Sequence, residues 1–153
     1  RMPAWNPVGF QIAYVLKRAG TTQIWVTTDG DVYLPKPNEQ LAQTGNETND
    51  FIPVWTRDGQ FVLFSETNFE GTVPASLMSI RYEDRETKEP VRLDLPRPIE
   101  DVEISPDGLW IVYETMDNDG NRDIYFMTIS GGNRTRLTLD PAVDFDPAWR
   151  PAP

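Results

Sequence analysis

The chain contains neither cysteine nor histidine. The absence of cysteine removes disulfides, thiolate nucleophiles and zinc–thiolate sites. The absence of histidine removes the usual general base and the commonest metal ligand, so a serine triad of the usual kind cannot form. Because the usual nucleophile and the usual general base are both missing, we expect no catalysis within this chain. Catalysis by carboxylates alone, as in glycoside hydrolysis, is the class that remains open.

Basic residues and long apolar runs are also scarce. The 14 Lys and Arg side chains stand against 24 Asp and Glu, which gives a net charge of −10. Affinity for nucleic acid comes mainly from neutralising phosphates, so an acidic chain is a poor partner for it and for anionic membranes. No apolar run approaches the roughly 20 residues of a spanning helix, and we expect no membrane insertion.

What the chain does contain favours an all-β fold. It has 14 prolines, 10 glycines, and 5 Trp, 5 Tyr and 7 Phe residues, a composition typical of many short strands joined by tight turns. With 39% apolar residues in 153, a packed core is expected. No window has a sustained helical period.

A repeat of about fifty residues organises the chain. One pattern of apolar and turn residues occurs in residues 2–14, 51–64, 101–113 and, in part, 145–151. Its aligned positions are Trp5, Trp55, Ile104 and Trp149. Spacings of this length are typical of one four-stranded propeller blade. Ser105–Gly108 and Thr56–Gly59 have the turn residues of tight hairpins.

The repeat predicts a single partial β-propeller domain over residues 1–153. We expect an arc of three four-stranded antiparallel blades plus a terminal closing strand. The predicted boundaries are about 2–44 for blade 1, 50–96 for blade 2, 100–139 for blade 3 and 144–151 for the closing strand. Propellers have typically 4–8 blades, so we expect the missing blades to come from the rest of a longer chain or, as the alternative, from self-association.

Four stretches resemble the TolB-type, WD-like β-propeller repeat: "AWNPVG", "VWTRDGQFVLFS", "ISPDGLWIVYE…DNDGNRDIYFMTISGGNRTRLT" and "DPAWRP". The resemblance implies a bacterial, non-catalytic module for protein–protein interaction or ligand sensing, in a periplasmic or extracellular setting. The alternative that it implies is an accessory propeller of an enzyme, such as a peptidase, whose catalytic domain is elsewhere.

Acidic residues gather just before the first strand of successive repeats. In a propeller these strands lie nearest the axis, so we expect the carboxylates to converge at one mouth of the channel. Such a rim would attract a protein or peptide with a basic patch. The alternative is a solvated loop that only aids solubility. The candidate rim residues are Asp50, Glu100, Asp101, Glu103, Asp144 and Asp146.

The tryptophans at the repeat position are expected to fill the packing between blades, with Ile104 as the substitute. The alternative is a stacking platform for sugars or peptides. Trp110, just after the third hairpin, is the candidate for an exposed contact.

Residues 117–123 (DNDGNRD) resemble a calcium loop, but the spacing places Thr115 and Phe126 where ligands are needed. We therefore expect a polar hairpin here, and neither a metal nor a cofactor in the chain. Calcium or sugar binding remains a third hypothesis, open to calorimetry.

Overall fold

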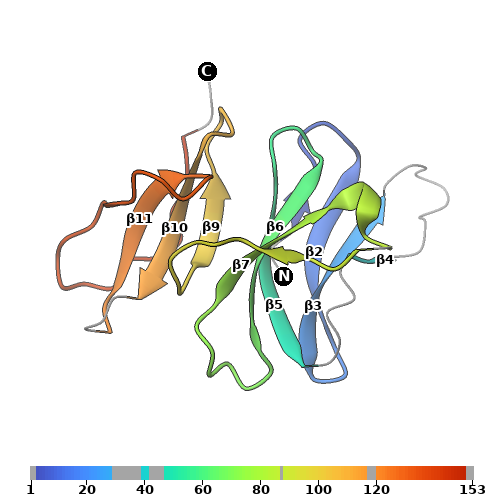
Figure 1. Ribbon diagram of the computed structural model, residues 1–153, viewed down its shortest axis with the longest axis horizontal. Helices are drawn as coiled ribbons and strands as arrows, with labels where there is room; N and C mark the ends of the chain where they lie inside the picture. Colours follow the sequence, from blue (N-terminus) through green and yellow to red (C-terminus); the bar gives the residue numbers. More distant parts are fainter. Residues whose placement is uncertain (1–2, 29–38, 42–46, 87, 117–119, 151–153) are drawn as a thin grey trace.

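Three antiparallel sheets make up the described part of the chain (Figure 1). The computed structural model describes residues 3–28, 39–41, 47–86, 88–116 and 120–150. The all-β prediction is confirmed: the helical structure within these ranges is a single 3₁₀ turn at Tyr82–Asp84.

Each sheet has four strands in chain order, paired antiparallel. The first sheet contains β1 (Ala4–Trp5), β2 (Gln11–Arg18), β3 (Thr21–Thr28) and β4 (Glu39–Gln40). The second contains β5 (Thr48–Trp55), β6 (Phe61–Asn68), β7 (Ser76–Arg81) and β8 (Val91–Arg92). The third contains β9 (Glu100–Ile104), β10 (Trp110–Met116), β11 (Arg122–Thr128) and β12 (Thr135–Arg136). The predicted closing strand is not paired into a ladder at residues 144–150.

Two apolar clusters hold neighbouring sheets together, and strand periodicity explains why one strand serves both. On β6, Val62 and Phe64 pack against the first sheet, whereas Leu63 between them packs against the third. Successive side chains of a strand point to opposite faces, so the continuous apolar run of β6 buries both faces. The first cluster also contains Ala13, Ile24, Val26, Leu41, Trp55, Met78 and Ile80. The second also contains Leu77, Ile99, Val102, Ile104, Ile111, Tyr113 and Met127.

The segment from β8 to β9 ties the second sheet to the third. The Ile99 amide donates to the Ala75 carbonyl at 3.1 Å, and the Ile99 carbonyl accepts from the Ser65 hydroxyl at 3.0 Å. From the other side, the Thr115 hydroxyl donates to the Pro98 carbonyl at 2.6 Å. Both sheets therefore bind the same short connection.

The hairpin turns of adjacent sheets also meet. The Asn6 side-chain amide donates to the Gly59 carbonyl at 3.1 Å. Gly59 has a φ of 68°, and a Cβ built there would lie 2.3 Å from Asn6 Oδ1. A side chain at this turn would therefore be strained and would collide with the neighbouring sheet.

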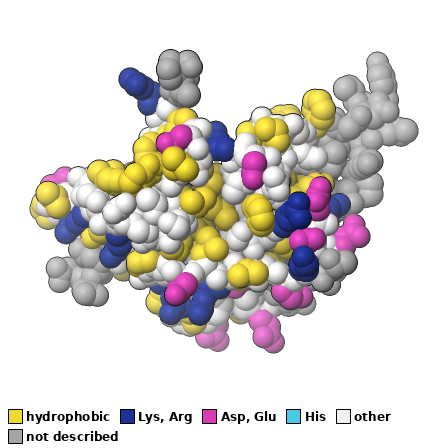
Figure 2. All heavy atoms as spheres, turned by 45° about the horizontal axis from the view of Figure 1, so that its top comes forward, with side chains coloured by type: hydrophobic (Ala, Val, Ile, Leu, Met, Phe, Trp, Pro, Cys, Tyr) yellow, Lys and Arg dark blue, Asp and Glu magenta, His cyan; other side chains and the backbone are white. Residues whose placement is uncertain are grey.

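Hydrophobic side chains gather in the hollow between the third sheet and the other two (Figure 2).

Candidate functional site

An open groove of about 380 Å³ runs beside β1, β5 and β9, the first strand of each sheet. Trp5, Arg57, Asp101, Glu103 and Asp146 line it, among apolar residues of the same strands. Because the three sheets contribute the same strand, this groove corresponds to the axial side of the arc.

A β-bulge lies at the same repeat position in two of the strands that line the groove, β5 and β9. In β5, Phe51 and Val54 face Ser65 and Leu63 of β6, so one residue of β5 is extra. In β9 the shift falls at Asp101, between Glu100 and Val102. Bulges re-aim side chains and are frequent beside functional sites.

The equivalent residues 52, 101 and 146 all line the groove. Each lies three residues before the repeat position of Trp55, Ile104 and Trp149. Ile52 and Asp146 both have positive φ, 51° and 54°, a conformation that aspartate tolerates and a β-branched residue rarely adopts. Two of the three equivalent residues therefore present the same backbone conformation to the groove.

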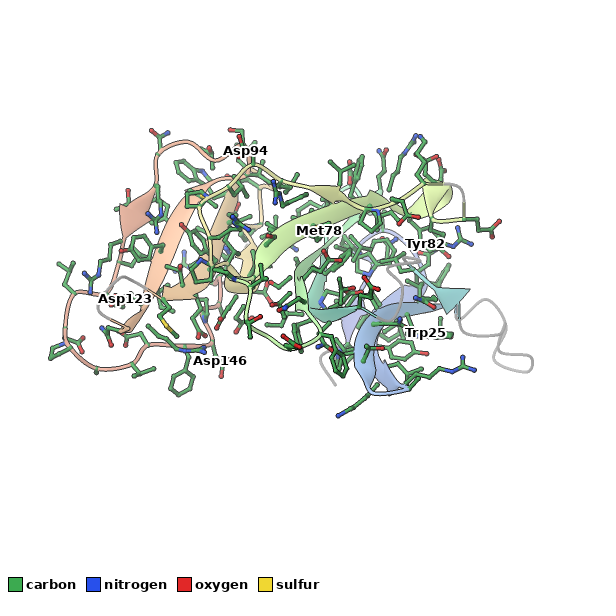
Figure 3. All side chains as sticks on the ribbon, turned by 60° about the horizontal axis from the view of Figure 1, so that its bottom comes forward. Trp25, Met78, Tyr82, Asp94, Asp123 and Asp146 are labelled. Carbon is green, nitrogen blue, oxygen red and sulfur yellow. The ribbon has the colours of Figure 1, made fainter. Side chains whose placement is uncertain are left out.

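Two carboxyl groups of the groove meet directly. Burial, a hydrogen bond to Asp146 and the charges of Asp146, Glu114 and Glu103 raise the pKa of Asp101 to about 7. Asp101 lies on β9, and Asp146 lies in the tail beside the third sheet (Figure 3). A hydrogen bond between two carboxyl groups needs a proton on one of them, and the raised pKa of Asp101 favours the proton there.

Glu103 of β9 and Arg57 of the turn between β5 and β6 also line the groove. Burial raises the pKa of Glu103, and the charge of Arg57 partly offsets this. The Arg57 guanidinium donates from Nη2 to the Ile104 carbonyl and from Nε to the Ser105 carbonyl, both at 2.9 Å. Arg57 thus holds the second and third sheets together.

Sequence reasoning did not single out Arg57 or the bulge residue Ile52. The signal was in the repeat alignment, where Arg57 replaces the proline found at residues 7, 106 and 151.

The predicted acidic rim is only partly assembled. Asp101, Glu103 and Asp146 share the groove. Glu100 instead pairs with Arg122, with Oε2 2.6 Å from Nη1. The amide of Asp144 donates to the Arg122 carbonyl at 3.0 Å, at the edge of the third sheet.

Asp50 does not belong to an exposed rim, because its side chain is fully buried. It lies inside β5 and not in the loop before it. The strand begins at Thr48, earlier than the sequence suggested, and this places Asp50 in the packed part of the sheet.

The equivalent tryptophans differ in burial. Trp55 is 3% exposed, lies in the first cluster and contacts the Tyr82 ring edge-on. Its indole N–H donates to the Ala4 carbonyl at 3.1 Å. Trp149 is half-buried, and its indole donates to the Glu103 carbonyl at 3.2 Å.

The prediction that Trp5 fills a packing position is wrong for the described residues, since its ring is 61% exposed. Trp55 packs on the sheet that precedes its own, and no described sheet lies in the corresponding place beside β1.

Trp110, predicted as an exposed contact, is half-buried and packs on Phe126, with ring centroids 5.5 Å apart.

Residues 117–119 of the predicted polar hairpin lie outside the described residues. Within the described ranges, no three carboxylates are grouped as a metal ion would need. Those ranges contain no helix with the length and apolarity to cross a membrane.

Comparison with known proteins shows which proteins this chain resembles in sequence and in fold. The chain is 31% identical over 139 residues to the Tol-Pal system protein TolB of Anaeromyxobacter dehalogenans (strain 2CP-C), a match covering 91% of this chain and 29% of that protein. The crystal structure of TolB from Acinetobacter baumannii matches with a TM-score of 0.65 at 20% identity, covering 94% of this chain and 33% of that one. No protein-family model matches the chain.

A structure from a study of two prolyl endopeptidases matches with a TM-score of 0.56 at 13% identity, covering 89% of this chain and 22% of that one. This chain thus spans less than a third of the curated relative, and the likeness to the endopeptidase concerns the fold alone.

Proposed function

Because this chain belongs to the TolB-type β-propeller repeat family, we propose that it is a non-catalytic protein-interaction module whose axial groove binds a basic peptide segment. The observation that carries the proposal is the gathering of Asp101, Glu103 and Asp146 in one groove beside the exposed ring of Trp5.

The groove offers two attractions to a cationic side chain. Carboxylates in a concave surface focus a negative potential and accept charge-assisted hydrogen bonds from Lys or Arg. An exposed indole adds a cation–π contact, worth about 0.5–1 kcal/mol at an accessible site. The curated relative is described as a component of the Tol-Pal system, which supports a protein as the partner.

The test is fluorescence anisotropy with a labelled peptide of alternating lysine and glycine, at pH 8 and low salt. The variants Asp101→Asn and Asp146→Asn keep the side-chain shape and remove the charge, so each should weaken binding and flatten its salt dependence. Asp94→Asn is the matched control, because Asp94 is exposed and does not line the groove (Figure 3). Equal binding by all three variants would reduce the acidic groove to a solubility feature.

The second candidate is an accessory propeller of a peptidase. It is favoured by the similarity in fold to the structure from the study of two prolyl endopeptidases. A Gly-x-Ser-x-Gly turn in sequence adjoining this chain in its gene would decide for it. Active-site labelling of the full-length gene product with a fluorophosphonate is the direct experiment.

A further inference from the structure

A second, larger cleft of about 700 Å³ opens between the second and third sheets. Ile52 lines both this cleft and the axial groove, so the two hollows lie on either side of the β5 bulge. The cleft walls carry Phe51, Val73 and Met116, each between 36% and 46% exposed, with Pro74 and Pro98 beside them. Its size is within the range of small-ligand and peptide pockets, about 300–1,000 Å³.

The bulge places Phe51 in this cleft. Phe51 is the last residue of β5 in regular register with β6 before the extra residue, and Ile52 follows it with positive φ. Strained backbone of this kind persists where the surrounding structure holds it and is concentrated at functional sites. The result is a phenylalanine displayed beside a hollow instead of packed between the sheets.

A cationic hollow of about 510 Å³ adjoins the cleft and shares Thr67, Val73 and Arg97 with it. Arg92 also lines this hollow. Neither guanidinium has a hydrogen-bond or ion-pair partner in the part of the chain that the structure describes. The chain has 24 acidic side chains for 14 basic ones, so two arginines in one hollow without a partner among the described residues are not expected from its composition.

Two acidic residues line the same two hollows as these arginines. Glu100 in the cleft is paired with Arg122 at 2.6 Å. Glu66 lies in the cationic hollow, and burial raises its pKa. Glu66 is therefore the carboxyl whose negative charge would repel a bound anion in this hollow.

We propose that the cleft and the cationic hollow together form a second docking surface, which binds an extended acidic–apolar peptide segment of a partner protein. Apolar side chains of the segment would enter the cleft at Phe51, Val73 and Met116, and its carboxylates would pair with Arg92 and Arg97. Charge-assisted pairs to arginine are the strong hydrogen bonds at such surfaces. This partner has the opposite charge from the one proposed for the axial groove, so the two inferences stand separately.

The number of cations favours a peptide over an acyl chain. Arg92 and Arg97 both line the hollow beside the cleft, and two cations suit the several carboxylates of an acidic peptide better than the single carboxylate of an acyl chain. The cleft is also lined by Ser65, Thr67 and Thr72, whose hydroxyls give it polar walls.

The experiment is fluorescence anisotropy of the full chain with a labelled peptide that has leucine and phenylalanine in one half and glutamates in the other. Arg97→Glu and Arg92→Glu should each weaken binding by about fivefold or more, and Val73→Asp should weaken it at the apolar wall. Glu66→Gln should strengthen binding, because it removes a negative charge that repels the carboxylates of the peptide. Lys17→Glu makes the same charge change at an exposed position of β2 and should leave binding unchanged.

Two controls accompany this experiment. The urea midpoints of the variants must match that of the parent chain, which is expected because the arginines and Val73 are exposed. The lysine–glycine peptide should bind the parent chain and these variants equally, whether or not the axial groove is its binding site. The proposal is overturned if Arg92→Glu and Arg97→Glu bind the acidic peptide as the parent does, or if laurate binds with the same variant dependence while the peptide does not bind.

Discussion

Replacing the tryptophans at the repeat position one at a time should give three different losses of stability. Trp55→Ala removes a ring that is 3% exposed, contacts both Tyr82 and the first sheet, and donates to the Ala4 carbonyl. Removing a buried large aromatic costs about 3–5 kcal/mol. Trp5→Ala removes a ring that is 61% exposed, and a surface change of this kind is usually within about 0.5 kcal/mol.

Trp149→Ala should lie between these two values. The ring is half-buried and makes one hydrogen bond, to the Glu103 carbonyl. Half of a full aromatic burial contributes about 1 kcal/mol, and the hydrogen bond about 1 kcal/mol more, so the expected loss is about 2 kcal/mol. Trp55→Phe, which keeps most of the buried area, provides a measurable variant if Trp55→Ala does not fold.

Urea denaturation followed by circular dichroism measures this order, because tryptophan fluorescence changes with each substitution. With slopes of about 1–3 kcal/mol/M, Trp55→Ala should lower the midpoint by roughly 1 M or more. Equal shifts for Trp5→Ala and Trp55→Ala would refute the assignment of Trp55 to the packing between the first two sheets.

Three further outcomes are expected. The pKa of Asp101 is raised in the folded chain to about 7, so its contribution to stability is present below pH 4 and is lost as the pH rises toward 7. In thermal melts, Asp101→Asn should therefore lose less stability between pH 5 and pH 8 than the parent chain does. Identical stability profiles would contradict the raised pKa. Arg57→Gln should lower the urea midpoint, because the Ile104 and Ser105 carbonyls each lose a charge-assisted hydrogen bond, whereas Lys17→Gln should not. Phe10 and Leu139 expose apolar surface at opposite ends of the arc, so sedimentation of this chain should show dimers or larger assemblies, and a sharply melting monomer would exclude that contact.

The fold was predictable because the repeat combines spacing with turn chemistry. The apolar residue at the repeat position, the turn that ends in glycine and the apolar strand that follows are local features, and the three sheets have them where expected. The groove carboxylates Asp101 and Asp146 were predictable for the same reason, since each holds a fixed place before a repeat position.

What the sequence did not reveal depends on contacts between sheets. Asp50 resembles a loop carboxylate until the strand around it is seen to begin at Thr48. Arg57 looks like an ordinary turn residue, and only its reach to the next sheet shows its role. Arg92 and Arg97 are far from Phe51 in the chain, and strand pairing brings them to adjoining hollows.

The two junctions between sheets use donors that come from different directions. At the first junction an indole of the later sheet donates backward, from Trp55 to the Ala4 carbonyl. At the second, isoleucine stands at that position, and Arg57 of the earlier sheet donates forward to Ile104 and Ser105. Backbone carbonyls at a junction can thus accept a hydrogen bond from a side chain of either the earlier or the later sheet. The tryptophan of one repeat and the arginine of the repeat before it are therefore alternative donors. In related arcs these two positions should therefore covary across repeats, with an exchange at one accompanied by an exchange at the other.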